Sequence, residues 1–383
     1  MKIIIVGMTN SIHLARWVEC FYKFKKFEIF VFPIAPVKIH PKLFKISNLN
    51  SKHSNINIFN IVPNINLNFF IQKILYAFFK NFFYLLALNI WINRIKPKYL
   101  HSHELTLAGA LCLKLKLYRK KFFPKWIVTN WGSDLFYFYK TKILKSYLKK
   151  IIHLSDYYSA ECNRDYKLAK KIGFKGSYLP CIPNSGGINF SLAKRLRLIE
   201  KPSHRKIIVI KGYQDEIGQA KNAILAINKI AGKIKNFQVV IFSANLEIIN
   251  LCKKIKLSQK VQLKIIDKNT ILSQQDMYNL FARSKIYIGI SKSDGISTSM
   301  LEAIALGTFP IQSDTSCSNE WIKNNISGFL VPWNDINIIS NKVLRVIHDN
   351  TLIEKSAKLN WGVVKKRGLD INIKKIAHTF YHQ

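Results

Sequence analysis

Short apolar runs alternate with longer segments of helical periodicity along almost the whole chain. The run KIIIVG at 2–7 predicts a buried strand, and 8–24 predicts a helix with Asn10 or Ser11 as its N-cap. In the second half, 273–284 predicts a helix that opens on a capping box of Ser273 and Asp276. Further segments typical of strands lie at 27–33, 56–63, 96–103, 125–134, 155–163, 205–213, 236–244, 261–267, 284–291, 308–314 and 328–332.

This alternation predicts an α/β protein with two doubly wound, Rossmann-like parallel sheets. Pro183, Gly186 and Gly187 cluster in the segment CIPNSGGINFS, which is typical of a boundary between domains. We therefore expect an N-terminal domain over 1–185 and a C-terminal domain over 186–360. In such sheets, ligands bind outside the carboxyl ends of the strands, so polar residues that follow the strands are the candidates for function.

The most informative of these polar loops is SDGIST at 293–298. It lies between the apolar run KIYIGIS and a helical segment that contains Glu302, eight positions after Asp294. Gly295 allows a ligand to approach the backbone, and Ser297 and Thr298 place amide N–H groups at a helix start, where anions bind well. A strand, a glycine-containing loop and a helix with an acid are typical of a site for a nucleoside diphosphate and its ribose. The alternative is an ordinary βαβ unit with a surface acid.

This pattern resembles the acid-x7-acid signature of the retaining family 4 glycosyltransferases, whose usual form is close to E-x-F-G-x-x-x-x-E-A-x-A-x-G-x-P-V-I. The chain has Asp294 in the first acid position, and Ile296 and Ser297 replace Phe and Gly. GFLVPWND at 328–335 is similar to the later G-L-L-V-x-x-x-D of the family. The resemblance implies the GT-B fold, in which two Rossmann-like domains face a cleft and a C-terminal helix, here 361–383, packs back on the N-terminal domain.

The family also carries Gly-Arg after a strand and a lysine before the next helix, which together neutralise the diphosphate. Here Gly212 is followed by Tyr213, so Lys211 stands in for the arginine, while Lys221 matches the lysine. The resemblance implies catalytic roles for Asp294 and Lys221. It also implies that the donor is bound by Lys211, Gly212, Lys221, Gly295, Ile296, Ser297, Thr298 and Glu302.

Polar residues also follow the predicted strands of the first half. His101 and His103 would share one side of an extended segment, as a metal pair would, but no third ligand presents itself. The phrase NWGSD resembles the family's H-G-S-D, with Trp131 in place of the histidine. The alternative is a structural role, in which Glu104 and Asp134 stabilise helix starts. The resemblance implies catalytic roles for His103 and Asp134, and an acceptor side made by Gly7, Ser11, His103, Glu104, Gly132 and Ser133.

Composition adds a strong positive charge to this picture. The chain has 383 residues and a net charge of +39, with +23 on 1–185 and +16 on 186–383. Such a charge attracts polyanions, either nucleic acid or an anionic membrane surface, and no nucleic-acid motif is present. The six cysteines have no paired spacing, so we expect neither a zinc site nor disulfides, and MKIIIVGMTNS does not resemble a signal peptide.

The segment 68–92 is the most apolar part of the chain, but Lys73 and Lys80 interrupt it, and a spanning helix requires about 20 apolar residues. We therefore expect no transmembrane helix there. Two interpretations remain open: core helices that cover the sheet, or an amphipathic face seated in a bilayer surface. The segments 114–125 and 136–150 mix lysines with Phe and Tyr, which suits an anionic headgroup layer and equally suits solvated helices with buried aromatic side chains.

Taken together, the sequence predicts a retaining glycosyltransferase that uses a nucleoside diphosphate sugar as co-substrate, with no other cofactor and no metal. Its predicted acceptor is a lipid-linked glycan, polysaccharide or lipopolysaccharide of a bacterial cell surface. Its predicted location is the cytoplasm, bound peripherally to the inner face of the plasma membrane, with no nucleic-acid partner. The alternatives are a nucleotide-sugar epimerase of the same fold and a non-enzymatic polyanion-binding protein.

Overall fold

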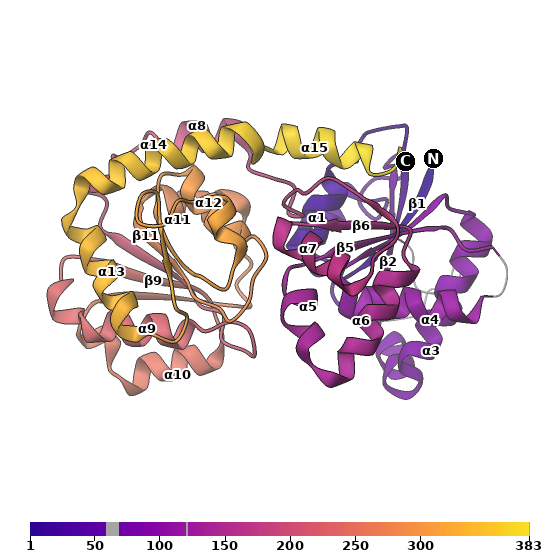
Figure 1. The fold of residues 1–383 in the computed structure, drawn as a ribbon, viewed down its shortest axis with the longest axis horizontal. Coiled ribbons are helices and arrows are strands. Elements are labelled where there is room, and N and C mark those ends of the chain that lie inside the picture. Colours follow the sequence, from indigo (N-terminus) through magenta and orange to yellow (C-terminus); the bar gives the residue numbers. More distant parts are fainter. Residues whose placement is uncertain (59–68, 120–121, 383) are drawn as a thin grey trace. The chain divides into compact units, whose positions relative to one another are not determined.

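The computed structural model describes residues 1–58, 69–119 and 122–382, without the side chains of 69–81, and divides into two compact units (Figure 1). The first unit comprises Met1–Gly187 and Ile373–Gln383, and the second comprises Ile188–Asn372. Each unit contains one sheet in which all the paired strands are parallel. The predicted fold class, two doubly wound parallel-sheet domains, is therefore confirmed.

The sheet of the first unit has the order β3-β2-β1-β4-β5-β6-β7. The chain runs outward from β1 to β3 and then returns to the other side of β1 with β4. The strand order thus reverses between β1 and β4, which makes their carboxyl ends a switch point of the kind where ligands bind. The strands are β1 (Lys2–Gly7), β2 (Glu28–Pro33), β3 (Ile56–Ile58), β4 (Tyr99–His103), β5 (Lys125–Asn130), β6 (Tyr157–Ala160) and β7 (Ser177–Tyr178).

Helices cover both faces of this sheet, so alternate residues of β1 enter different core clusters. Ile3 and Ile5 pack with residues of α1 and of the C-terminal segment, whereas Ile4 and Val6 pack with residues of α3, α4 and α6. The helices are α1 (Ile12–Glu19), α2 (Pro41–Ile46), α3 (Phe69–Ile95), the π-helix η1 (Leu105–Gly109), α4 (Ala110–Tyr118), α5 (Ser133–Phe136), the 3-10 helix η2 (Phe138–Lys140), α6 (Lys142–Leu154) and α7 (Asn163–Ile172).

The elements of the first unit differ from the sequence prediction mainly at their ends. Ser11 is the N-cap of α1, as expected, but the helix ends at Glu19 because Cys20 begins a series of turns. The strand expected at 56–63 is β3 over its first three residues, and residues 59–63 lie outside the described part of the chain. Most of the apolar segment 68–92 lies in α3, whose Tyr84, Leu88 and Trp91 are buried in the core. Residue 68 and the side chains up to 81 are outside the description.

The sheet of the second unit has the order β10-β9-β8-β11-β12-β13. Here the order reverses between β8 and β11, which places a second switch point at their carboxyl ends. The strand β11 is buried along its whole length, as expected for a central parallel strand. The strands are β8 (Ile207–Lys211), β9 (Gln238–Ala244), β10 (Gln262–Asp267), β11 (Ser284–Gly289), β12 (Phe309–Ser313) and β13 (Phe329–Val331).

A core cluster packs α9, α10, α13 and the start of α14 against one face of this sheet. The predicted capping box is confirmed, because Ser273 accepts the N–H of Asp276 and the Asp276 carboxylate accepts the N–H of Ser273. The helices are α8 (Phe190–Leu196), α9 (Ala220–Lys229), α10 (Leu246–Lys254), α11 (Gln274–Ala282), α12 (Thr298–Ala305), α13 (Ile336–His348), α14 (Asn350–Arg367) and the 3-10 helices η3 (Pro202–His204), η4 (Ala231–Lys233), η5 (Leu257–Gln259) and η6 (Cys317–Glu320).

Two helices occupy the C-terminal stretch where one was expected. The helix α14 ends at Arg367 with Gly368 as its C-cap, and α15 (Asp370–Thr379) follows it. Ile373, Ala377, Phe380 and Tyr381 are buried in the core of the first unit, so the chain returns there after completing the second. Among the described residues, no helix is both long enough and apolar enough to span a membrane.

Candidate functional site

The switch point of the second unit holds an ion pair. Lys211 is the last residue of β8, and Asp294 lies in the loop after β11, the neighbouring strand. The Lys211 Nζ atom lies 3.7 Å from Asp294 Oδ2, and both side chains remain partly exposed. Since the two strands are parallel neighbours, their carboxyl ends bring these residues together although 83 positions separate them in the sequence. The sequence analysis named both residues as candidates but did not predict an ion pair between them.

Lys211 keeps its positive charge in this setting. Burial lowers its pKa, but Asp294, with smaller contributions from nearby tyrosines, outweighs burial and raises the pKa above the usual lysine value. The ammonium group also lies 4.7 Å from the centre of the Tyr213 ring. A cation held by one carboxylate and one aromatic face is well suited to exchange its partner for a phosphate oxygen.

The loop after β8 is braced against the loop after β11. Gln219 N–H donates to Ile290 O at 2.9 Å, and Lys292 N–H donates to Ile217 O at 2.8 Å. Gly212 has no room for a side chain, because an added Cβ would lie 2.8 Å from Phe242 O. Asp215 accepts the N–H of Ile217 and closes the turn. Backbone contacts therefore fix the carboxyl edge of the sheet around Lys211.

The predicted SDGIST loop leads into α12, as expected. Ser297 is the N-cap and Thr298 is the first helical residue, and Glu302 lies one turn further on and is 3% exposed. Gly295 O accepts the N–H of Cys317, and Ile296 is buried. Because the first amide groups of a helix lack partners within the helix, this end attracts anions.

Lys221 stands apart from the group around Lys211 and Asp294. It is the second residue of α9, it is exposed, and its backbone N–H donates to Gln214 Oε1 at 3.0 Å. Its position at a helix start beside the loop after β8 matches the prediction, but its ammonium group has no contact with the pair. Its catalytic role therefore stays a prediction.

In the first unit, the carboxyl ends of β1, β4 and β5 bring together most of the predicted acceptor side. Gly7 ends β1, and a Cβ added there would lie 3.4 Å from the Cβ of His103, at the end of β4. The Ser11 hydroxyl accepts the N–H of His13 as part of its cap, so its side chain has a structural role. The His103 and Trp131 rings lie edge to face, with their centres 5.3 Å apart.

His103 is the most unusual residue of this group. It is fully buried, and neither Nδ1 nor Nε2 has a hydrogen-bond partner among the described residues. The Oγ1 atom of Thr9 and the indole Nε1 of Trp131 are likewise buried without a partner among those residues. Burial, with smaller contributions from His101 and His13, holds the pKa of His103 well below its usual value. A neutral imidazole offers one donor and one acceptor, which suits a sugar hydroxyl.

His101 has a structural role instead of a metal-binding one. Its Nδ1 lies 2.7 Å from the Tyr381 hydroxyl, and its Nε2 lies 2.6 Å from Thr129 Oγ1. Burial lowers its pKa to about 3, so the ring is neutral at ordinary pH. Both nitrogens are occupied, and the hydrogen bonds tie the C-terminal segment to the middle of the first sheet.

Glu104 and Asp134 stabilise the two loops beside His103. Glu104 has a φ of 116°, and its carboxylate accepts the N–H groups of Thr106, Leu107 and Ala108 at the start of η1. Asp134 Oδ2 accepts the N–H groups of Leu105 and Trp131, each at 3.1 Å. Burial raises the pKa of both carboxyl groups. These contacts favour a structural role for Glu104 and Asp134, in which they stabilise helix starts and do not bind an acceptor.

The backbone at NWGSD forms a tight turn. Gly132 has a φ of 75°, which favours glycine, and Ser133 begins α5. A glycine in this conformation allows the loop after β5 to turn sharply at the carboxyl edge of the sheet. Both residues thus lie beside Trp131, as the acceptor-side prediction requires, while their contact with an acceptor stays a prediction.

Residues 197–360 match the family model of glycosyl transferases group 1. The matched stretch, called the group 1 domain below, makes up less than half of the chain and lies entirely in the second unit. The match includes Lys211, Lys221, Asp294 and Glu302. The resemblance to glycosyl transferases group 1 is therefore confirmed, while the narrower resemblance to the retaining family 4 stays a prediction. A shorter stretch of 43 residues is 46% identical to a protein of Sulfolobus islandicus filamentous virus (isolate Iceland/Hveragerdi) whose name places it among glycosyltransferases. That stretch covers 11% of this chain and 13% of the viral protein.

Solved structures that resemble this chain over its full length share the two-domain architecture. Sucrose-phosphate synthase from Thermosynechococcus elongatus has a TM-score of 0.73 and 13% identity, covering 100% of this chain and 98% of that one. HepE from Anabaena, in complex with UDP-glucose, has a TM-score of 0.70 and 11% identity over 100% of both chains. At these identities the similarity establishes the GT-B fold for the group 1 domain and its partner unit.

Sequence reasoning missed two buried polar residues of the group 1 domain. The Tyr287 hydroxyl on β11 lies 2.9 Å from Ser299 Oγ and 3.3 Å from Ser297 Oγ at the start of α12. Gln312 on β12 is 1% exposed, and its Oε1 has no hydrogen-bond partner among the described residues. A Cβ added at Gly289 would lie 2.5 Å from that oxygen. The one signal in the sequence was a glutamine within the otherwise apolar run TFPIQS.

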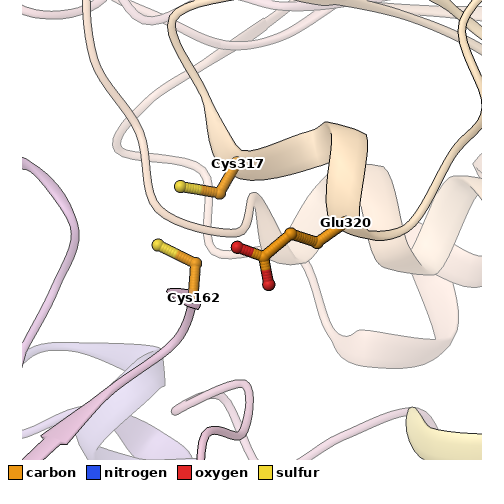
Figure 2. A group of neighbouring side chains, drawn as sticks. All are labelled: Cys162, Cys317 and Glu320. Atoms are coloured by element: carbon orange, nitrogen blue, oxygen red, sulfur yellow. The ribbon is translucent and has the colours of Figure 1, made fainter. Parts of the chain in front are cut away.

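Among the described residues, no cluster of cysteine and carboxylate side chains within one unit could hold a metal ion. Cys317 and Glu320 belong to η6 of the group 1 domain (Figure 2), and the backbone of Cys317 supports the loop that carries Asp294. Cys162, drawn in the same figure, is the N-cap residue of α7 in the first unit. Among the described residues, no three His, Cys, Asp or Glu side chains of one unit converge on a common point.

Proposed function

We propose that this protein is a retaining glycosyltransferase that transfers a sugar from a nucleoside diphosphate sugar to a glycan or lipid-linked acceptor. The observation that carries the proposal is the Lys211–Asp294 pair at the switch point of a group 1 domain, directly before the N-terminus of α12. A cation, a helix N-terminus and a carboxylate at one switch point are what a departing diphosphate and a sugar require.

Charge develops on the diphosphate as the bond between sugar and phosphate breaks. Lys211, the N-terminus of α12 and the exposed Lys221 would neutralise this charge, so the mechanism asks for no metal and no other cofactor. Asp294, released from Lys211 when the phosphate binds, would face the positive charge that grows on the sugar ring. Glu302 would accept hydrogen bonds from the ribose hydroxyls. The acceptor would then attack from the face that the diphosphate leaves, without a protein nucleophile.

The acceptor side of the proposal rests on the first unit. His103, Thr9 and Trp131 present polar atoms that are buried and lack partners among the described residues, at the carboxyl edge of adjacent strands. Buried polar groups without partners cost about 1–3 kcal/mol each, so a bound hydroxylated ligand would recover that free energy. Because burial holds the pKa of His103 well below its usual value, the neutral ring would orient an acceptor hydroxyl by hydrogen bonding at neutral pH.

Incubation of the protein with a panel of nucleoside diphosphate sugars tests the proposal. We expect slow hydrolysis of one donor without acceptor, and the released sugar should keep the anomeric configuration of the donor. Release of an epimerised sugar instead would identify an epimerase. If no member of the panel were hydrolysed or bound, as measured by calorimetry, the proposal would be wrong.

We further propose that the first unit docks on an anionic membrane surface. The helix α6 buries Leu148, Ile151 and Ile152, and its other face exposes Ile143 (87%) and Tyr147 (38%). Exposed aliphatic and aromatic side chains surrounded by lysines suit the interface between headgroups and acyl chains. The exposed lysines of this helix are Lys142, Lys145, Lys149 and Lys150.

Sedimentation with vesicles of phosphatidylcholine, with and without phosphatidylglycerol, tests the docking. Binding should require phosphatidylglycerol and weaken as the salt concentration rises, because lysines contribute about 1 kcal/mol each near an anionic surface. The variant Ile143→Ser should bind less tightly, whereas Ile271→Ser, at another exposed site in the second unit (66%), should bind normally. Equal binding to both vesicle types, or no binding at low salt, would contradict the docking.

A further inference from the structure

A basic pocket in the second unit shares no residue with the site around Lys211 and Asp294. It lies between the end of α8, the segment before η3 and one face of α14, and has a volume of about 310 Å³. This is the lower end of the range for pockets that hold small ligands. The side chains that line it are Arg197, Leu198, Glu200, Lys201, Pro202, Glu354, Ala357, Lys358 and Trp361.

Arg197 is fixed in this pocket without an acidic partner. Its guanidinium carbon lies 4.6 Å from the centre of the Trp361 ring, and Trp361 is itself stacked on Phe190 with 7° between the ring planes. The Nε–H group is buried and has no hydrogen-bond acceptor among the described residues. Burial lowers the pKa of Arg197. Arginine keeps its charge even then, so a planar donor group is held in place with an unused N–H.

A second arginine makes the wall of the pocket rigid. Arg205 is fully buried, and its guanidinium donates to Glu200 O at 2.9 Å and to Leu306 O at 2.9 Å. It also reaches Arg197 O at 3.5 Å. One side chain therefore holds the backbone of both Arg197 and Glu200 against the C-terminal end of α12. A pocket whose wall is fixed in advance loses little entropy when it binds a ligand.

The cations outnumber the carboxylates around this pocket. Glu354 accepts the N–H of Ser203 at 3.0 Å, and although burial raises its pKa, the bond to Ser203 and the charges of Arg205 and Lys201 lower it overall. The lowered pKa keeps that carboxylate ionised. The lining still carries three cations, Arg197, Lys201 and Lys358, against the two carboxylates Glu200 and Glu354, which leaves an excess of one positive charge in the pocket.

We propose that this pocket binds a phosphate monoester, with Arg197 as the directional donor and Lys201 and Lys358 as flanking charges. Arginine donates parallel N–H groups in a geometry that matches phosphate oxygens, and lysine adds charge without direction. The inference is independent of the glycosyltransferase proposal, because none of these residues belongs to the donor or acceptor site.

The rim of the pocket suggests where such a phosphate could come from. Leu198 and Ile199 are 72% and 60% exposed, directly between Arg197 and Lys201 in the chain. Two exposed aliphatic side chains beside a phosphate site would suit a phospholipid headgroup, with the aliphatic groups among the acyl chains. A soluble phosphate ester would use the same donors and leave the rim in water. A phospholipid and a soluble ester present the same phosphate group to these donors. The experiment below distinguishes between them.

Calorimetric titration of the full chain with glycerol 3-phosphate at low ionic strength tests the site. We expect binding that weakens at least about tenfold in Arg197→Gln and in Lys358→Gln, because charged hydrogen bonds are lost. Arg195→Gln, an exposed position on the same helix outside the lining, is the matched control and should bind like the parent protein. Lys211→Met should also bind normally, since it alters only the donor site.

Vesicles that contain phosphatidic acid form the second arm. Arg197→Gln should reduce vesicle binding if the natural ligand is a lipid, and Leu198→Ser should then reduce it as well. If Leu198→Ser leaves vesicle binding unchanged while Arg197→Gln still abolishes glycerol 3-phosphate binding, the ligand is a soluble ester. The proposal is overturned if Arg197→Gln binds glycerol 3-phosphate normally, or if Lys211→Met removes the binding.

Discussion

Replacing Lys211 by methionine should lower kcat for sugar transfer by about 10²–10³-fold, the usual cost of removing one preorganised donor from a developing negative charge. Lys211 is the cation that lies at the switch point, 3.7 Å from Asp294 and 4.7 Å from the Tyr213 ring centre. Methionine keeps most of the side-chain volume and removes only the charge. The loss should appear mainly in kcat, because the charge on the diphosphate grows as the sugar leaves.

The matched control for this variant is Lys233→Met, which changes an exposed lysine of η4 in the same unit. Its activity should equal that of the parent protein, which shows that a general loss of positive charge is not the cause. Lys211→Arg should restore part of the rate, since it returns the charge with a different shape. If Lys211→Met folds normally by thermal unfolding and keeps near-normal kcat, Lys211 is not the cation that receives the diphosphate. Lys221→Ala would then become the decisive variant, because Lys221 is the other predicted cation.

The sequence predicted the part of the site whose residues lie close together in the chain. The strand, loop and helix around Asp294, Ser297 and Glu302 lie within about twenty consecutive residues, so spacing alone indicated their arrangement. Lys211 was assigned because it stands next to Gly212, where the resemblance to the family implies a cation after a strand. Its pairing with Asp294 required knowing that β8 and β11 are neighbours, and strand order in a parallel sheet depends on helix packing that no short motif encodes.

In the first unit, contacts between residues far apart in the sequence were even harder to predict. Tyr381 and His101 are hydrogen-bonded across 280 positions of sequence, and nothing near either residue indicates the other. Glu104 was assigned to the acceptor side because of the resemblance of its segment to the family. Its φ of 116° turns the carboxylate onto the amide groups of η1 instead, which a residue pattern cannot reveal. His103 was predicted from the same phrase, and what distinguishes it from His101 is the absence of hydrogen-bond partners among the described residues.

Replacing Glu302 by glutamine should weaken binding of the donor's nucleoside diphosphate about 10–100-fold, because each hydrogen bond from a ribose hydroxyl to a charged carboxylate contributes about 1.5–3 kcal/mol. Glu302→Ala should abolish transfer while the protein still folds. Glu302 is 3% exposed on α12 in the helix that follows the Asp294 loop, so its charge is poorly solvated and interacts strongly with any hydroxyl that reaches it.

A comparison of two nucleotides separates this role from a structural one. The diphosphate identified by the donor panel should bind the parent protein much more tightly than Glu302→Gln, whereas its 2′,3′-dideoxy form should bind both proteins equally weakly, because it lacks the hydroxyls that the carboxylate accepts. Glu247→Gln, at an exposed position in the first turn of α10, is the control and should change neither affinity. An equal loss for both nucleotides in Glu302→Gln would mean that the carboxylate supports the fold of α12. The assignment of the ribose to this helix would then be wrong, while Lys211 and Asp294 could still hold the diphosphate.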